Sequence, residues 1–526
     1  MGIARVASRA QLGLAAPPVE VEVHLGQGLP TFSIVGLPAT AVKESKDRVR
    51  AALQNSGFEF PAGRITVNLS PADLPKEGCR YDLPIALGIL LASSQIESSD
   101  ESIARAEFYG ELGLAGELKP VKGVLLAAAH AARAARGVVV PIANVHEARL
   151  AAPERARGAA TLLGVCGLFA TRAAPAVEAA AETAAFRAGD PASPQKAPDL
   201  ADVRGQAAGK RALLVAAAGG HSILLIGPPG TGKSMLAQRL PGLLPGLAGE
   251  EALDVASIAS VSTRGFDACN YGQRPYRAPH HTASASAIIG GGPHARPGEV
   301  SLAHRGVLFL DELPEFNRRV LESLREPLET GVVAISRAAL QVEYPARFQL
   351  VAAMNPCPCG YLGESSGRCR CAPPEIARYR ARVSGPLLDR IDLRVEIPAV
   401  PSEELLGEQA PCDISSTSAY AARRVRLTRE LQCRRAGKLN SELRGSEIQD
   451  FCRLDRVCRL LLTQARKKLD LSARGVHCVL RVARTIADLE LADLELAAAE
   501  KETGPMDQKI GPVHLAEALQ LRRTND

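Results

Sequence analysis

Alternating apolar and polar residues in the first third of the chain predict strands with one buried face. Residues 19–25 alternate valine or leucine with glutamate or histidine, and residues 64–69 are interpreted as a second strand. The charged amphipathic stretch 41–56, which stops before Gly57, and the apolar stretch 82–92 predict two helices. The N-terminal region is therefore expected to be a mixed α/β domain.

Short, continuous apolar runs in the middle of the chain predict buried parallel strands. Such runs occupy residues 222–226, 307–310 and 348–353, with helical patterns between them. This order favours a parallel sheet covered by helices. From residue 402 onward the pattern is helical with few strand signals, so we expect an all-helical C-terminal domain.

Changes in composition indicate where the domains meet. Residues 170–199 are rich in alanine and proline and poor in bulky apolar residues, which is typical of a linker, and a weaker break lies near Pro398–Pro401. The fold class is therefore expected to be α/β. The expected divisions are an α/β domain at 1–170, a linker at 171–199, a second α/β domain at 200–400 and a helical domain at 401–526.

Composition excludes several classes of protein. The chain has 526 residues, of which 46% are hydrophobic and 23% charged, as in a folded protein of several domains. Tryptophan is absent and aromatic residues make up 4%, which argues against a single-strand binder that stacks bases. No uncharged apolar run reaches the ~18 residues of a transmembrane helix, and residues 1–10 lack the apolar core of a signal peptide. We therefore expect a cytoplasmic protein without a membrane partner.

A phosphate-binding loop is the clearest chemical signal. Residues 227–234, GPPGTGKS, fit the pattern G-x-x-x-x-G-K-[ST], directly after the strand HSILLI and before the helical MLAQRL. Glycines let backbone N–H groups approach phosphate, and the start of the helix adds its positive end. Lys233 is expected to reach the β- and γ-phosphates of ATP, and Ser234 to ligate Mg²⁺. The predicted nucleotide-binding residues are Gly227, Pro228, Pro229, Gly230, Thr231, Gly232, Lys233, Ser234 and Asp311.

Two carboxylates complete this predicted site. The apolar run 307–310 ends in Asp311 and Glu312, which places both side chains at the carboxyl edge of the sheet, where ligands bind. We expect Asp311 to hold Mg²⁺ through water. We expect Glu312 to orient or deprotonate the water that attacks ATP.

A group of four cysteines is a candidate metal site. The pattern C-x-C-x₉-C-x-C places four thiolates within 15 residues, which can hold a structural zinc ion. The spacing is tighter than the usual C-x-x-C, so four reduced surface thiols remain the alternative. Adjacent His280 and His281 cannot easily bind one metal from regular structure, and no metal is expected there. The candidate zinc ligands are Cys357, Cys359, Cys369 and Cys371.

Several longer stretches resemble one protein family. RPYRAPHHTASASAIIGGG, AAMNPCPCG, SGPLLDRID and the N-terminal VEVHLGQGLPTFSIVGLP are similar to the ComM/YifB family of AAA+ proteins, often called magnesium chelatase-like. The resemblance covers nearly the whole chain. It implies a P-loop AAA+ core, a helical lid and an N-terminal domain like that of Lon proteases (ribosomal S5 domain 2-like). It also implies a helix-2 insertion at 265–300, a pre-sensor-1 hairpin at 331–345 and a cysteine loop at 357–371.

The resemblance assigns roles to single residues. Asn355 matches sensor 1, the polar side chain that contacts the γ-phosphate and water, and Arg474 matches sensor 2. Arg390 matches the arginine finger, which acts on the ATP of a neighbouring subunit, and Arg382 competes for a contact with phosphate. A finger supplied by a neighbour implies a ring, so the resemblance predicts a homo-hexamer.

Basic residues are the candidates for binding DNA. In the family the insertion and the hairpin normally face the pore of the ring, although their basic residues could equally stabilise the ring interface. Residues 421–484 carry a local charge of +11, whereas the rest of the chain carries −5. This concentration suits contact with a phosphate backbone, a solvated helix or a subunit contact. The candidate DNA contacts are Arg274, Arg277, Arg296, Arg337, Arg423, Arg424, Arg434 and Arg435.

Three functions agree with these features. The resemblance implies a hexameric, ATP- and Mg²⁺-dependent DNA translocase or helicase that promotes branch migration in recombination or natural transformation. Its partners would be single-stranded or branched DNA and recombination proteins. A magnesium chelatase motor subunit is an alternative, although the chain lacks room for an integrin-like domain. A Lon-like protease or unfoldase is another, but Arg80 and Leu125 occupy the positions of the Lon catalytic serine and lysine.

Overall fold

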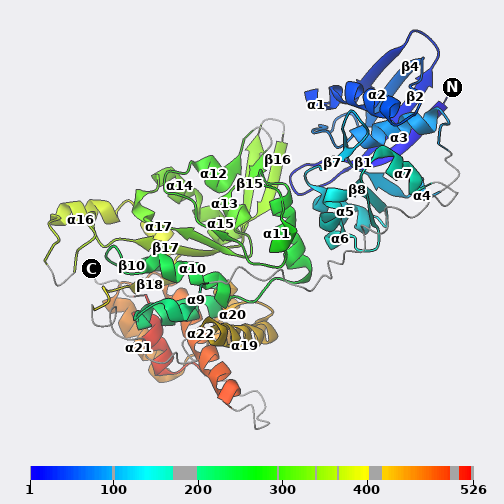
Figure 1. Cartoon of the computed structure of the whole chain (residues 1–526). Coiled ribbons are helices and arrows are strands. Elements are labelled where there is room, and N and C mark those ends of the chain that lie inside the picture. Colours follow the sequence, from blue (N-terminus) through cyan, green and yellow to red (C-terminus); the bar gives the residue numbers. More distant parts are fainter. Residues whose placement is uncertain are drawn as a thin grey trace. The chain divides into compact units, whose positions relative to one another are not determined.

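The computed structural model describes residues 2–96, 101–169, 198–292, 295–337, 340–363, 367–401, 417–497 and 509–522, which form two compact units (Figure 1). The first unit takes its residues from Met1–Ala192, Gly249–Tyr271 and Ser336–Tyr344, and the second from Ser193–Ala248, Gly272–Ile335 and Pro345–Asp526. The predicted linker at 171–199 lies outside the described residues, except for its last two positions.

A seven-stranded mixed sheet forms the centre of the first unit. Its strands, in sheet order, are β3 (Thr31–Val35), β4 (Arg64–Ser70), β2 (Pro18–Gly26), β1 (Gly2–Arg9), β5 (Ala106–Phe108), β8 (Gly137–Pro141) and β9 (Ala156–Ala159). β2 pairs antiparallel with β1 and β4, whereas the other pairings are parallel. Val19, Val21 and Val23 of β2 are buried, while Glu20 and His24 are exposed. The period-two pattern therefore predicts this strand correctly.

The helices of the first unit follow the sequence pattern with one exception. α3 (Asp82–Ala92) has its predicted bounds and packs on β1 and β2, with every residue except Leu91 buried. The stretch 41–56 forms two helices rather than one, α1 (Thr40–Lys43) and α2 (Ser45–Asn55). At the break, the Ser45 hydroxyl donates to the Val42 carbonyl at 2.7 Å and so competes with regular helical hydrogen bonds.

Residues 249–271, which the sequence assigns to the second α/β domain, belong to the first unit. Helix α11 (Gly249–Ser260) packs beside α5 (Val124–Arg133). Ser260 Oγ also donates to Oε1 of Glu147 at 2.6 Å, on α6 (Val145–Ala151).

A five-stranded parallel sheet forms the centre of the second unit. In sheet order its strands are β11 (Tyr276–Arg277), β14 (Val307–Leu310), β17 (Gln349–Met354), β10 (Ile223–Ile226) and β18 (Leu393–Glu396). All neighbouring strands run in the same direction, so the five carboxyl ends lie along one edge. β10, β14 and β17 match the predicted apolar runs, whereas β11 and β18 were not predicted.

The segment expected to form the insertion, 265–300, includes β11 and most of the connection from β11 to β14, and the segment expected to form the hairpin, 331–345, lies between β14 and β17. Residues 265–271 and 336–344 of these segments belong to the first unit. Between β11 and β14 lie α12 (Ala285–Ile289), β12 (Gly290–Gly291), β13 (Arg296–Pro297) and α13 (Glu299–Leu302). Between β14 and β17 lie α14 (Arg318–Ser323), α15 (Arg325–Thr330) and the hairpin strands β15 (Val332–Arg337) and β16 (Leu340–Pro345).

The described residues after 416 form helices, as predicted (Figure 1). α19 (Ser418–Ala436) and α22 (Ala473–Ala497) pack against α9 (Ala207–Gly219), which precedes β10. The lid also contains α20 (Ser446–Phe451), α21 (Arg456–Lys468) and α23 (Pro512–Gln520).

A buried ionic network joins this lid to the sheet. The Asp392 carboxylate, directly before β18, lies 3.0 Å from both His221 Nδ1 and Arg481 Nη2. His221 Nε2 lies 2.8 Å from Thr485 Oγ1 on α22. Burial alone would raise the pKa of Asp392, but Arg481 and His221 outweigh it and hold that pKa well below its usual range. The network therefore fixes α22 to the strands β10 and β18.

The structure confirms the predicted fold class, with a mixed α/β unit, a parallel α/β core and a helical lid. In the part of the chain that the structure describes, no helix combines the length and the apolar character needed to cross a membrane.

Candidate functional site

The predicted phosphate-binding loop connects β10 to α10 (Lys233–Leu243). Gly230 and Gly232 have φ angles of 77° and 87°, in the left-handed region that glycine adopts without strain. Helix α10 begins at Lys233, so its unpaired backbone N–H groups and its positive end face the loop. The loop therefore has the backbone donors of a phosphate site.

Lys233 lies folded over this loop. Its Nζ donates to the carbonyl oxygens of Gly227 and Pro228, both at 2.7 Å, and to Asn355 Oδ1 at 3.2 Å. Burial lowers the pKa of Lys233, while the nearby Asp311 carboxylate acts in the opposite direction. The structure thus brings Asn355, at the end of β17, into contact with the lysine predicted to bind phosphate.

The two predicted magnesium ligands lie side by side. Ser234 Oγ donates to Asp311 Oδ2 at 2.7 Å. A hydroxyl and a carboxylate are the kind of oxygen donors that Mg²⁺ prefers, together with water and substrate phosphates. Ser234 and Asp311 therefore fit a magnesium ion, which would neutralise the charge of the phosphates.

Glu312 contacts a histidine on the neighbouring strand connection, and its charge also acts on Lys233. Its Oε2 lies 3.2 Å from Nδ1 of His281, which follows β11, whereas Asp311 contacts Ser234, which follows β10. The sheet order places β10 and β11 on opposite sides of β14. Glu312 also has a φ of 52°, an uncommon conformation for a residue other than glycine. The sequence singles out His281 only as an unsuitable metal ligand, and its contact with Glu312 was not predicted.

Arg390 and Arg474, predicted as the arginine finger and as sensor 2, meet at the edge of the sheet opposite the phosphate loop. Arg390 Nη2 lies 2.6 Å from Glu329 Oε1, and Arg474 Nη1 reaches the same oxygen at 2.6 Å. β18 is parallel to β10, with Leu393 opposite Ile223. Because Arg390 precedes β18, it lies beyond the amino edge, whereas the phosphate loop follows the carboxyl edge. Glu329 was not predicted from the sequence.

Arg382 lies on the carboxyl side instead. Its Nη1 donates to Glu315 Oε2 at 2.9 Å, and Glu315 is three residues beyond Glu312. Arg382 is therefore separated from Arg390 and Arg474, which lie at the amino edge of the sheet.

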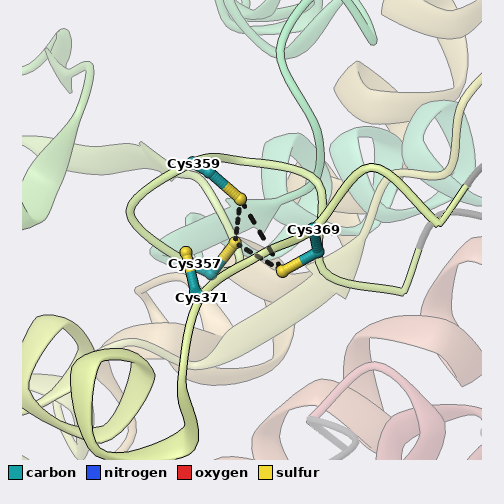
Figure 2. Close-up of side chains that lie close together, drawn as sticks. All are labelled: Cys357, Cys359, Cys369 and Cys371. Atoms are coloured by element: carbon teal, nitrogen blue, oxygen red, sulfur yellow. Dashed lines mark hydrogen bonds between the residues drawn. The ribbon is translucent and has the colours of Figure 1, made fainter.

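The four predicted zinc ligands converge, and Figure 2 shows their sulfur atoms facing one another. Cys357 Sγ lies 3.3 Å from Cys359 Sγ and 3.7 Å from Cys369 Sγ, and the last two are 3.6 Å apart. All four sulfur atoms lie within 4.8 Å of one another. Zn–S bonds of ~2.3 Å in a tetrahedron give S–S distances of ~3.8 Å, close to those observed. The backbone N–H of Tyr361 is the largest cause that lowers the pKa of Cys359 to about 6. The neighbouring sulfur atoms outweigh the backbone hydrogen bonds of Cys369 and Cys371 and raise the pKa of each of these two thiols.

The cysteine loop packs on the nucleotide site. Asn355 is two residues before Cys357. Gly360 has a φ of 88°, and a Cβ atom there would approach Cδ of Pro229 to 2.7 Å. The backbone of the cysteine loop therefore touches the phosphate loop directly.

Of the arginines expected to contact DNA, four already contact other groups of the protein. Arg274 donates to two backbone carbonyls, and Arg277 pairs with Glu299. Arg424 pairs with Asp493, and Arg435 pairs with Asp488. The exposed ones are Arg296, Arg423 and Arg434. The side chain of Arg337, in the last position of β15, lies outside the described residues.

The residues expected at the positions of the Lon catalytic dyad are packed into the fold. Arg80 Nη2 donates to Gln11 Oε1 at 2.7 Å and to the Lys122 carbonyl at 2.8 Å. Leu125 is fully buried. Lys76, which lies nearby in the sequence, is also buried and donates to the Pro71 carbonyl.

These features define the class of the protein. A parallel sheet with a phosphate loop on one strand, a carboxylate pair on another and a polar residue on the strand between them is the arrangement of a P-loop ATPase of the AAA+ class. The family described as "Magnesium chelatase, subunit ChlI" matches residues 199–405. Two further ChlI families match residues 21–144 and 415–499.

Relatives extend this similarity over nearly the whole chain. Competence protein ComM from Haemophilus influenzae is 47% identical over 99% of this chain and 98% of its own length. YifB from Salmonella typhimurium is 49% identical over 94% of each chain. The chain therefore belongs to the ComM/YifB family of magnesium chelatase-like AAA+ proteins, which indicates an ATPase that uses ATP and Mg²⁺. The magnesium-chelatase 38 kDa subunit from Rhodobacter capsulatus is 29% identical over 29% of this chain and 48% of its own length.

Two substitutions separate nucleotide binding from hydrolysis. Lys233→Ala should abolish ATP binding, because it removes the cation expected to contact the phosphates. Glu312→Gln should bind ATP with unchanged affinity but hydrolyse it about 10²–10⁴ times more slowly, because the amide cannot accept a proton from water. Calorimetric titration with ATP and a phosphate-release assay measure the two effects. Normal turnover by Glu312→Gln would contradict the role assigned to this carboxylate.

Proposed function

We propose that this protein is an ATP-dependent DNA translocase or helicase, active as a hexameric ring, that promotes branch migration in recombination, including natural transformation. The observation that carries the proposal is the separation of the phosphate loop from Arg390 and Arg474 by the length of the central sheet. A strand of four residues spans ~13 Å, which supports action of these arginines on the ATP of a neighbouring chain rather than of their own.

This separation favours a site shared between subunits. Arg390 would stabilise the γ-phosphate bound by the next subunit, a contribution of about 10³–10⁵ in rate for arginine fingers. Arg474 contacts the same oxygen of Glu329 as Arg390 does, which supports action of both arginines on one nucleotide. Asn355, in contact with Lys233, would act on the nucleotide of its own chain. Repetition of such a contact around a closed ring yields the proposed hexamer.

DNA is the substrate that the combined observations favour. A relative with 47% identity over nearly the full length is named a competence protein. The exposed Arg296, Arg423 and Arg434 are available for phosphate contacts, whereas Arg424 and Arg435 are engaged with acidic residues of the lid. We therefore assign the DNA contacts first to the three exposed arginines. Single-stranded or branched DNA and recombination proteins in the cytoplasm would be the partners.

A magnesium chelatase motor is the second candidate, because the matching family descriptions name that enzyme. Such a motor would need a separate protein to handle the metal and the tetrapyrrole. A Lon-like protease has less support as a candidate, because Arg80 and Leu125 are expected at the positions of the catalytic serine and lysine and both are packed into the fold.

We also propose that Cys357, Cys359, Cys369 and Cys371 bind a structural zinc ion. The distances between the sulfur atoms support tetrahedral coordination. Four protein ligands leave no open position, so the ion would have no catalytic role of its own. Its effect would be to stiffen the loop that follows Asn355 and packs on Pro229.

Metal analysis tests the zinc proposal. Protein purified from zinc-replete cells should contain one zinc per chain, and the double substitution Cys369→Ser/Cys371→Ser should contain none. Because the loop contacts the phosphate loop, this variant should also bind ATP more weakly. Cys433→Ser, at an exposed cysteine far from this cluster in the sequence, is the control and should keep its zinc. Well under one zinc per chain in the unaltered protein would contradict the proposal.

ATPase stimulation tests the proposed substrate. DNA should accelerate ATP hydrolysis, whereas porphyrin with Mg²⁺ and unfolded protein should not. If six phosphates are neutralised, log–log plots of affinity against salt should have slopes of about −5 for duplex and about −4 for single strands. The double substitution Arg423→Ala/Arg434→Ala should make the slope less steep by about two.

Arg5→Ala is the matched control, because Arg5 is exposed but pairs with Glu20 and Glu22. It should leave the slope unchanged. Affinity for DNA that does not respond to salt, or stimulation by porphyrin alone, would contradict the proposal.

A further inference from the structure

Glu329 is the meeting point of the two arginines at the amino edge of the sheet. It lies near the end of α15, and its Oε1 accepts from Arg390 and Arg474, each at 2.6 Å. Arg444 donates to its backbone carbonyl at 2.7 Å. Arg474 and Arg390 lower the pKa of Glu329, so the carboxylate is ionised at neutral pH. One negative charge thus faces two guanidinium groups, and the group as a whole keeps an excess of positive charge.

Arg390 cannot contact another molecule in this conformation. Its side chain is only 10% exposed, its Nη2 contacts Glu329, and its Nη1 donates to the Pro386 carbonyl at 2.6 Å. The Nε atom is buried and has no hydrogen-bond partner in the described part of the chain. Because so little of the Arg390 side chain is exposed, its guanidinium group can reach an acceptor on another molecule only if its present contacts rearrange.

A carboxylate and a phosphate are interchangeable acceptors for a guanidinium group. Both accept two parallel N–H bonds from arginine, and both carry the charge that makes these bonds strong. Glu329 therefore offers the two arginines, within their own chain, the type of contact that a γ-phosphate would offer them from a neighbouring chain.

We propose that Glu329 is a latch that holds Arg390 and Arg474 in their own subunit until the γ-phosphate of the neighbouring subunit replaces it. The latch rests on the trans action of Arg390 proposed above. Glu329 is a positioning residue, since it acts on hydrolysis only through the arginines. A subunit in the latched conformation cannot engage its neighbour. The apparent affinity between subunits is therefore the intrinsic affinity multiplied by the fraction of subunits that is unlatched.

Mixing two inactive variants isolates this effect. The donor carries Lys233→Ala, so it binds no ATP but supplies the arginines, and the acceptor carries Arg390→Ala, so it binds ATP but supplies no finger. Titration of the acceptor with donor gives the donor concentration at half-maximal ATPase rate and the maximal rate. Adding Glu329→Gln to the donor should lower the half-maximal concentration about two- to fivefold, the range expected for a partly exposed ion pair. The maximal rate should stay the same.

Matched variants separate the latch from a structural role. Glu326→Gln, one turn earlier on α15 and exposed, should leave the donor unchanged. Glu329→Gln placed on the acceptor, whose Arg390 is absent, should leave the half-maximal concentration unchanged. If the Glu329→Gln donor does not fold, as judged by circular dichroism, Glu329→Asp should give a smaller shift in the same direction, because the shorter side chain reaches the arginines less well.

Three results would overturn the latch: an unchanged or higher half-maximal concentration, a lower maximal rate, or an equal shift with Glu326→Gln. No activity in any mixture would overturn the trans action of Arg390 and the latch together. Activity in the mixture without an effect of Glu329→Gln would overturn the latch alone, so the two failures are distinguishable.

Discussion

The parallel register of the five-stranded sheet is the constraint on which the rest of the structure depends. β10 pairs with β17 on one side and β18 on the other, with Ile223 opposite both Val351 and Leu393. In a parallel sheet, residues that follow strands gather at one edge and residues that precede strands gather at the other. The phosphate loop, Asp311 and Asn355 all follow strands, whereas Arg390 precedes one. The phosphate loop and Arg390 therefore lie at opposite edges of one sheet, and this separation supports the proposed ring.

The buried network around Asp392 connects this sheet to the lid. A charged carboxylate is costly to bury, and His221 and Arg481 compensate that cost only while β10, β18 and α22 keep their positions. Helix α22 is continuous over 25 residues and begins at Ala473, next to Arg474. Movement of the lid would therefore displace Arg474 relative to Glu329. The position of the lid and the contact of Arg474 with Glu329 are therefore physically linked.

Structural features that depend on residues close together in the chain could be predicted from the sequence. Continuous apolar runs predict β10, β14 and β17, and the glycines and Lys233 predict the phosphate loop, because each signal lies within one short segment. β11 has only two residues, and β18 alternates buried Leu393 and Val395 with more exposed neighbours, so neither produces such a run. The contacts of Glu312 with His281 and of Glu329 with two arginines were out of reach, since they join segments that only the tertiary fold brings together.

The fold also alters the interpretation of residues 421–484 as a concentrated basic surface. The net charge of +11 over residues 421–484 overstates the basic surface, because three of the arginines pair with acidic residues just beyond that segment. Arg435 and Arg484 contact Asp488, and Arg424 contacts Asp493, with both carboxylates on α22.

A synthetic four-way junction with homologous arms tests most directly whether ATP hydrolysis drives this protein along DNA. The protein should convert the junction into two duplexes only with ATP and Mg²⁺, and Glu312→Gln should bind the junction and ATP but form product about 10²–10⁴ times more slowly. Conversion by Glu312→Gln at the normal rate, or no conversion where DNA accelerates ATP hydrolysis, would contradict the proposed function.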